Sequence, residues 1–376
     1  MTLPRRQGSE RAGTEERFAL HRAFWSGSDQ GRPLASFRIG DFFFARHYRA
    51  AASLLVPEKE TVSGDLAVAD YMDDYERMFA EAESCGQDAF WTAEPYTGIP
   101  WMEAILGCEV RAGKEAFTTR PAYASAAMAA DAMERVVSDM RSNPSSNPWL
   151  AKYLEFTKAL VQLGRGRFTV GQPITRGPSD MVGALLGQTG MVYSLIDDPG
   201  SMERLVSAVT KAFLTVIKLQ RELVPAFHGG TALGFYHVWA PGTSIWFQDD
   251  LSAILSPSMY GEFFLGAARD ICRGYEYTAV HLHHSSFFIL DRLLELPELC
   301  AVEVNKDIGG PSVPEMVGIL ERILEKKRLI LWGDITLDDL AFLKSRIPPR
   351  GVFLNIVAPS AEEAHARNKY VQEWSE

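Results

Sequence analysis

Eight short apolar segments, separated by longer segments with helical spacing of apolar residues, most constrain the fold of this chain. Strands that alternate with helices pair in parallel, because each helix returns the chain to the same edge of the sheet. Eight such units without a linker predict an α/β protein with a single (β/α)8 barrel, also called a TIM barrel. The expected strands are Leu34–Phe37, Ala89–Thr92, Phe168–Gly171, Thr231–Trp239, Thr278–Leu282, Ala301–Val304, Leu329–Trp332 and Val352–Ile356.

The chain of 376 residues shows no internal boundary in composition. Barrels often exceed ~250 residues as single domains. We therefore expect residues 1–15 to form a disordered lead-in and residues 16–376 to form the barrel.

The balance of charge limits the partners of the protein. Asp and Glu number 48 against 38 Lys and Arg, a formal net charge of −10. This balance argues against nucleic acid and against an anionic membrane surface, because both require clustered basic residues. The four cysteines are far apart, and the polar N-terminus lacks the apolar region of a signal peptide. We expect a cytoplasmic protein that acts on a small molecule.

A pair of histidines ends the fifth expected strand. His281 and His283 are two residues apart, so their side chains point to the same face. Neutral imidazole is the commonest metal ligand, and a polar pair at the end of a buried strand needs partners. The pair is either a metal or catalytic site, or two hydrogen-bonded histidines near a strand end.

Three further residues could join this pair. Glu303 and Asn305 share one face of the next expected strand, and Glu303 is either a ligand or part of a buried ion pair. His237 shares a face with Trp239 on the preceding expected strand. His237 is either a third imidazole of the site or a packed core residue.

Acidic residues follow two of the expected strands. Asp334 could act as a base or orient a histidine, or it could cap the next helix. Asp249 and Asp250 form a carboxylate pair that could divide acid and base roles, or could cap or salt-bridge. We assign Asp249 and Asp334 as candidate catalytic residues.

Aromatic residues cluster near the ends of the early strands. A wall of this kind would suit a flat apolar or heteroaromatic substrate, although core packing accounts for about half of such residues. The candidates for substrate binding are Trp91, Tyr96, Tyr236, Trp239 and Trp246.

The chain contains, in this order, a Gly-Pro turn within Arg176–Gly187, an Asp-Asp, Ser-Pro and Tyr-x-x-Phe block within Asp249–Phe263, and His281-Leu-His283. This ordered set of segments resembles the uroporphyrinogen decarboxylase superfamily. The resemblance extends from about residue 15 to the end of the chain. It implies a TIM barrel with its site at the carboxyl ends of the strands.

The decarboxylase branch of this superfamily uses no metal and holds carboxylates with arginines. By this resemblance Arg38 matches the first arginine, and Glu94 lies near the position of the catalytic aspartate. The second arginine falls on Phe42, the tyrosine on Ala184 and the C-terminal histidine near Ala358. These departures weaken the expected clamp for a polycarboxylate.

The methyltransferase branch moves a methyl group between a corrinoid and a thiol, using zinc held by His-x-Cys and a later Cys. His281 matches the histidine, His283 replaces the first cysteine, and the segment 355–359 has no thiol. Related enzymes place an acidic ligand near Glu303 and Asn305. A histidine-rich site would suit Zn, Fe, Ni or Co, and the resemblance favours zinc.

Three hypotheses follow, in this order. The first is a metal-dependent methyltransferase whose corrinoid comes on a partner protein or as a free cofactor. The second is a cofactor-free decarboxylase of uroporphyrinogen or another carboxylated aromatic. The third is a non-catalytic binding barrel. Dimers through an apolar barrel face are common in the superfamily, so the resemblance also allows a homodimer.

Overall fold

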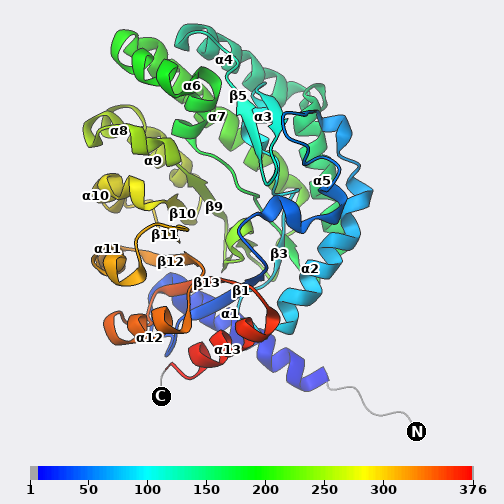
Figure 1. Cartoon of the computed structure of the whole chain (residues 1–376), viewed down its shortest axis with the longest axis vertical. Helices are drawn as coiled ribbons and strands as arrows, with labels where there is room; N and C mark the ends of the chain where they lie inside the picture. The colour runs from blue at the N-terminus through cyan, green and yellow to red at the C-terminus, as the bar shows by residue number, and fades with distance from the viewer. Residues whose placement is uncertain (1–6, 375–376) are drawn as a thin grey trace.

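The computed structural model describes residues 7–374 and places six strands in one parallel sheet. Their order is β1–β13–β12–β11–β10–β9, and every neighbouring pair runs parallel. Helices surround these strands (Figure 1). The predicted α/β class with a parallel sheet is therefore confirmed. The bounds are β1 Leu34–Ile39, β9 Ser244–Gln248, β10 Tyr277–Leu282, β11 Ala301–Lys306, β12 Arg328–Gly333 and β13 Val352–Ala358.

Two shorter parallel strands, β3 (Thr92–Ala93) and β6 (Thr169–Val170), pair separately from the main sheet. Within residues 7–374 the strand ladders therefore do not form one continuous eight-stranded ring. Other hydrogen bonds cross the two gaps. The amide of Asp88 donates to the carbonyl of Ala35 at 2.9 Å. Between β6 and β9, the side chain of Gln172 bonds both the N–H and the carbonyl of Trp246, at 3.2 and 3.1 Å.

The expected fourth strand, Thr231–Trp239, is wrong, and β9 takes its place in the sheet. Residues 231–240, which we call the inner segment, form the antiparallel pair β7 (Thr231–Ala232) and β8 (Trp239–Ala240) around a 3-10 turn, η6 (Gly234–Tyr236). Gly234 has φ +45°, a conformation that glycine adopts without steric cost. The turn also requires glycine because a Cβ at this position would collide with the backbone of Gln172.

The sheet separates two buried apolar clusters. The larger one fills the space between the strands and the surrounding helices. The smaller one lies on the inner face of the strands, where Phe235 and Val238 of the inner segment pack with Trp246, Ile330 and Phe353. The inner segment therefore fills the space that the strands enclose.

Helix α1 (Gln7–Ser26) covers the ends from which the strands start. Trp25 packs against Tyr277, the first residue of β10, with ring centroids 5.1 Å apart and the ring planes tilted by 59°. The side chain of Arg328, the first residue of β12, donates to the carbonyl of Trp25 at 3.3 Å. Part of the expected disordered lead-in is thus helical, from residue 7, and residues 1–6 lie outside the described residues.

The remaining helices follow the signals in the sequence. Ser312 and Glu315 form a capping box at the start of α11, and Ser256 caps α8 just before Pro257. Among the helices within residues 7–374, none is both long and apolar enough to cross a membrane. The helices are α2 Met72–Ser84, α3 Trp101–Ile105, α4 Ala126–Ser142, α5 Pro148–Gly164, α6 Pro178–Asp197, α7 Pro199–Leu223, α8 Pro257–Phe263, α9 Leu265–Arg273, α10 Leu290–Leu294, α11 Val313–Lys326, α12 Leu337–Arg346 and α13 Ala361–Gln372. A small antiparallel sheet contains β2 Glu60–Thr61, β4 Glu109–Ala112 and β5 Phe117–Arg120.

Candidate metal centre

Three potential metal ligands meet at the carboxyl ends of β9 and β10. One ligand atom from each of Asp250, His281 and His283 lies within 4.8 Å of the other two. Nε2 of His281 is 3.7 Å from Oδ1 of Asp250, and Nε2 of His283 is 3.8 Å from Oδ2. The two strands are parallel neighbours, so the histidines and the aspartate emerge at the same edge.

The opposite nitrogen of each histidine faces a carboxylate. Nδ1 of His281 contacts Oε2 of Glu303, which is its partner in the β10–β11 register. Nδ1 of His283 is 2.5 Å from Oδ1 of Asp307. A histidine whose Nδ1–H donates to a carboxylate has a free lone pair on Nε2 for a metal. Histidines that bind metals usually have this arrangement.

Asp307 is shared by two histidines. Its Oδ2 is 2.7 Å from Nδ1 of His284, and its Oδ1 also accepts a hydrogen bond of 2.8 Å from Nδ2 of Asn305. Burial raises the pKa of Asp307, but the bonds from His283 and His284 outweigh it and lower the pKa to about 2. Asp307 therefore remains an anion that can hold His283 in place.

The His281–Glu303 pair is deeply buried. Glu303 is fully buried and His281 is 7% exposed. Burial lowers the pKa of His281, but the charges of Glu303 and Asp250 outweigh it and raise the pKa to about 9. His281 therefore lies between two carboxylates, with Glu303 at Nδ1 and Asp250 near Nε2.

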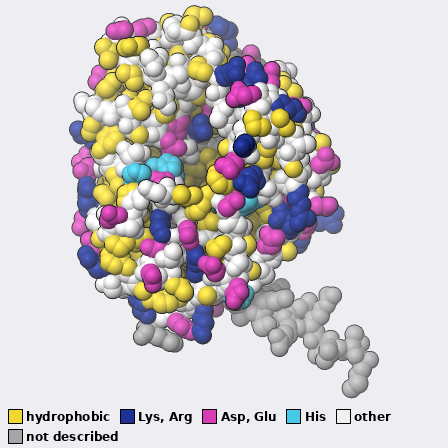
Figure 2. Space-filling view, viewed as in Figure 1, with side chains coloured by type: hydrophobic (Ala, Val, Ile, Leu, Met, Phe, Trp, Pro, Cys, Tyr) yellow, Lys and Arg dark blue, Asp and Glu magenta, His cyan; other side chains and the backbone are white. Residues whose placement is uncertain are grey.

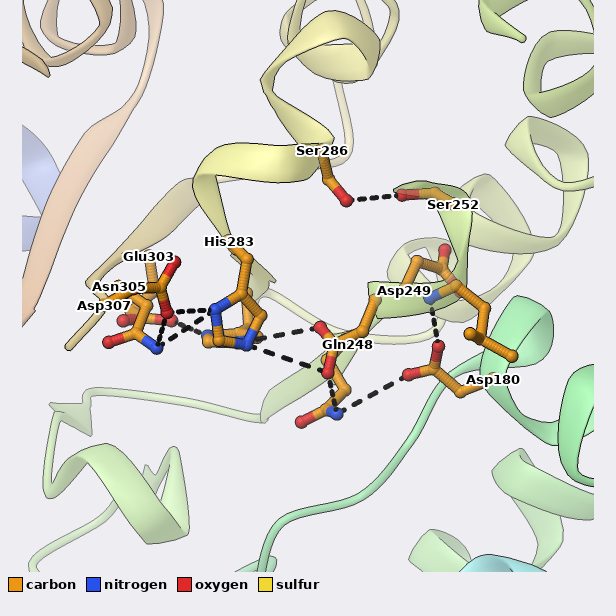
Figure 3. Close-up of polar contacts among 12 residues, drawn as sticks. Asp180, Gln248, Asp249, Ser252, His283, Ser286, Glu303, Asn305 and Asp307 are labelled. Atoms are coloured by element: carbon orange, nitrogen blue, oxygen red, sulfur yellow. Dashed lines mark hydrogen bonds and ion pairs between the residues drawn. The ribbon is translucent and has the colours of Figure 1, made fainter. Parts of the chain in front are cut away.

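Further polar groups surround Asp250, among them Gln248 and Asp180, which Figure 3 labels. The amide of Gln248 donates to Oδ2 of Asp250 at 2.7 Å and lies 3.5 Å from Oδ2 of Asp180. Asp180 accepts the backbone N–H of Leu251 at 2.7 Å. Burial, followed by the charges of Asp250 and Asp249, raises the pKa of Asp180 well above its usual range.

A cavity of about 640 Å³ opens beside the histidines. Its wall includes Asp250, His283 and Asn305 together with the aromatic rings of Phe42 and Trp332. Figure 2 shows a hollow on this face of the molecule, with histidine side chains at its edge. The volume is typical of small-molecule sites.

The structure brings together five of the residues that the sequence singled out. His281 and His283 contribute Nε2 to the ligand group, while Glu303 and Asn305 lie on the Nδ1 side and orient the rings. Tyr236 bonds to the His281–Glu303 pair.

His237 lies elsewhere, on the inner segment. Its Nδ1 accepts the backbone N–H of Thr92 at 2.9 Å, and its ring stacks near Trp91 at a centroid distance of 6.2 Å. Burial lowers the pKa of His237 well below its usual range. The structure therefore supports the packed-core alternative for this residue.

The two candidate catalytic aspartates also have local partners. Asp249 accepts hydrogen bonds from the N–H and hydroxyl of Ser179 at 3.0 and 2.8 Å, and from Tyr260 at 3.0 Å, so it caps α6. Burial raises the pKa of Asp249 to about 6. Asp334 is half-exposed and pairs with Arg367 at 2.7 Å.

Arg38 and Glu94 form a second polar cluster. Nitrogen Nη2 of Arg38 lies 3.5 Å from Oε1 of Glu94 and donates to the carbonyl of Phe235 at 2.5 Å, while the guanidinium sits 4.2 Å from the Phe235 ring centroid. Burial raises the pKa of Glu94 to about 7, even though Arg38 and Thr97 act in the opposite direction. Arg38 is thus held by Glu94 and by the carbonyl of Phe235.

The other aromatic candidates pack in the interior. The hydroxyl of Tyr96 donates to the carbonyl of Ala45 at 3.1 Å. The backbone carbonyl of Trp239 accepts a hydrogen bond of 2.8 Å from the indole N–H of Trp25. Trp246 packs edge-on against Tyr236 at 4.8 Å. The rings that line the cavity are instead Phe42 and Trp332.

The sequence interpretation missed Asp307 and His284, and it named Asp250 only as one of a carboxylate pair for acid and base work, not as a metal ligand. Asp307 follows β11 directly after Asn305 and Lys306, and His284 follows His283. Residues that directly follow parallel strands meet at one edge of the sheet. The positions of Asp307 and His284 just after their strands could therefore have identified both residues.

Comparisons with known proteins give a likeness of fold. The structure is similar to that of a methyltransferase from Methanosarcina mazei, with a TM-score of 0.62 and 15% sequence identity. The match covers 96% of this chain and 99% of that protein. The likeness concerns the fold alone. The sequence matches no protein-family model and no curated protein.

Proposed function

We propose that this protein is a metal-dependent methyltransferase in which Asp250, His281 and His283 hold a divalent metal. The main observation in support is the convergence of three ligand atoms within 4.8 Å. Two imidazoles and one carboxylate suit Zn, Fe, Ni or Co, and we favour zinc. A bound metal would act as a Lewis acid and lower the pKa of a coordinated thiol or hydroxyl.

Residues around the ligands would keep the site ready for the metal. Glu303 and Asp307 hold the Nδ1 sides of the two histidines, and Gln248 holds Asp250 by its Oδ2. The adjoining cavity of about 640 Å³ would seat the methyl acceptor. We propose a corrinoid as methyl donor, free or on a partner protein.

The fold likeness to a methyltransferase supports this proposal. We further propose that the eight parallel strands act as one TIM barrel, with the bonds of Asp88 and Gln172 bridging its two gaps, and that the chain belongs to the uroporphyrinogen decarboxylase superfamily. A cytoplasmic location and a homodimer remain predictions.

The structure does not support the decarboxylase hypothesis. A clamp for carboxylates needs free cationic groups, but Arg38 is bound by Glu94 and by the carbonyl of Phe235. Its side chain is only 15% exposed. A non-catalytic barrel would also have little use for an array of carboxylates that orients two histidines.

The proposed function is tested with the zinc-loaded protein, methylcobalamin and a set of small thiols. In the reaction the Co–C bond breaks, its electron pair stays on cobalt, a C–S bond forms and the thiol loses its proton. The change in corrinoid absorbance would report turnover. Asp250→Asn should lose both zinc and turnover, whereas Asp131→Asn, on a half-exposed aspartate of α4 paired with Arg204, should keep both. Zinc-independent turnover, or unchanged zinc content in Asp250→Asn, would contradict the proposal.

A further inference from the structure

Tyr236 reaches the candidate metal centre from the inner segment rather than from the strands that bear the histidines. Its side chain is 2% exposed. The hydroxyl lies 2.9 Å from Oε2 of Glu303 and 3.0 Å from Nδ1 of His281. Glu303 and His281 are in contact themselves, so three side chains from three segments form one closed triangle.

We propose that Tyr236 is a positioning residue that fixes which nitrogen of His281 carries the proton. Glu303 is an acceptor when ionised, so its Oε2 can accept both the Tyr236 hydroxyl and the Nδ1–H of His281. With both donors directed at Glu303, the proton of neutral His281 stays on Nδ1. Nε2 then keeps a lone pair toward Asp250. If Tyr236 donated to Nδ1 instead, the proton would move to Nε2 and His281 could not bind metal there.

The backbone around Tyr236 is held firmly enough to support this role. Its carbonyl accepts the amide of Asn355 at 3.0 Å, and the preceding residue, Phe235, donates its N–H to Gln172 at 3.0 Å. The ring packs edge-on against Trp246 at 4.8 Å. Contacts on both sides therefore aim the hydroxyl at the Glu303–His281 pair.

The inference depends on the proposed metal site, and a matched pair of variants separates the two. Tyr236→Phe removes only the hydroxyl that meets Glu303. Tyr260→Phe is the control, because Tyr260 is also fully buried and also donates to a carboxylate, Asp249, outside the ligand group. Loss of a group that supports a ligating histidine weakens metal affinity by about 10- to 100-fold.

The first measurement is zinc affinity by competition with a chromophoric chelator, together with thermal melting of the metal-free proteins. We expect Tyr236→Phe to weaken zinc binding at least about tenfold, and Tyr260→Phe to leave it within twofold while it lowers the melting temperature. In a Glu303→Gln background, Tyr236→Phe should have a smaller effect. Equal affinity in Tyr236→Phe and wild type would overturn the inference but leave the metal site intact. Failure of the wild type to bind zinc would overturn the metal site itself.

A second measurement needs no variant of Tyr236. Nitrogen-15 NMR of zinc-loaded wild type, with His281 assigned by its loss in His281→Gln, reports which imidazole nitrogen bears hydrogen. We expect hydrogen on Nδ1 and zinc on Nε2. Zinc on Nδ1 would overturn the inference even if Tyr236→Phe failed to fold.

Discussion

Substitution of Gly234 by alanine should destabilise the protein strongly, because the inner segment turns at this residue against the backbone of a neighbour. Gly234 has φ +45°, and a Cβ built there would lie 1.9 Å from the carbonyl oxygen and 2.5 Å from the nitrogen of Gln172. Neither atom belongs to a flexible side chain. The backbone of residues 171–172 or of the inner segment must therefore move.

Two costs add up. An L-residue in the left-handed region costs roughly 1–2 kcal/mol, and an extra methyl group forced into a packed interior costs about 1–3 kcal/mol. The expected loss in the free energy of unfolding is thus about 2–5 kcal/mol. Gly261→Ala is the control. It lies inside α8 at an ordinary φ with no atom within 4 Å of an added Cβ, so alanine should stabilise by about 0.5–1 kcal/mol.

The assay is equilibrium urea unfolding of both variants and the wild type, followed by tryptophan fluorescence. Comparable slopes would allow the midpoints to be converted into differences in free energy. Zinc affinity should also fall in Gly234→Ala, because Tyr236 is two residues away. If Gly234→Ala lost less than about 1 kcal/mol, the account of the inner segment as a tightly packed turn would be refuted.

Three other outcomes are expected. Burial raises the pKa of Glu94 from 4.5 to about 7. Protonated Glu94 therefore contributes to the free energy of unfolding, and this contribution is lost as the pH rises from 4.5 to 7. Denaturation across that range should show that the free energy of unfolding falls more in wild type than in Glu94→Gln, by up to about 3 kcal/mol. Gln172→Leu should lower the free energy of unfolding, measured in urea, by about 2–4 kcal/mol. The substitution removes the side-chain amide that is the hydrogen-bond partner of both the backbone N–H and the carbonyl of Trp246. Asp249→Ala should lower the melting temperature by removing the cap of α6, yet bind one zinc at saturation by elemental analysis.

Much of the sheet could be predicted from the sequence because buried parallel strands are apolar on both faces. β10 to β13 were all found at nearly their observed bounds. The inner segment was misread as a strand because it is also apolar and aromatic, and periodicity cannot distinguish a strand from a buried turn. Its Gly234 was the available signal, since an isolated glycine inside a strand pattern suggests a bend.

The candidate site was partly predictable for a similar reason. His281 and His283 stand out because polar residues are unusual at the end of an apolar strand, and Glu303 and Asn305 follow from the same logic on the next strand. The choice between Asp249 and Asp250 could not be made from sequence. The two neighbours point in different directions: Asp249 points toward Ser179 at the start of α6, and Asp250 points toward the histidines. Only the tertiary structure distinguishes a helix cap from a potential ligand.

The central claim is that Asp250, His281 and His283 bind one divalent metal, and a crystal of the zinc-loaded protein tests it most directly. An anomalous difference map at the zinc edge should show one strong peak per chain at about 2.0–2.2 Å from Nε2 of both histidines and from an oxygen of Asp250. Glu303 and Asp307 should remain on the Nδ1 sides. A well-ordered site without a peak there, or with zinc on Nδ1 of either histidine, would contradict the account.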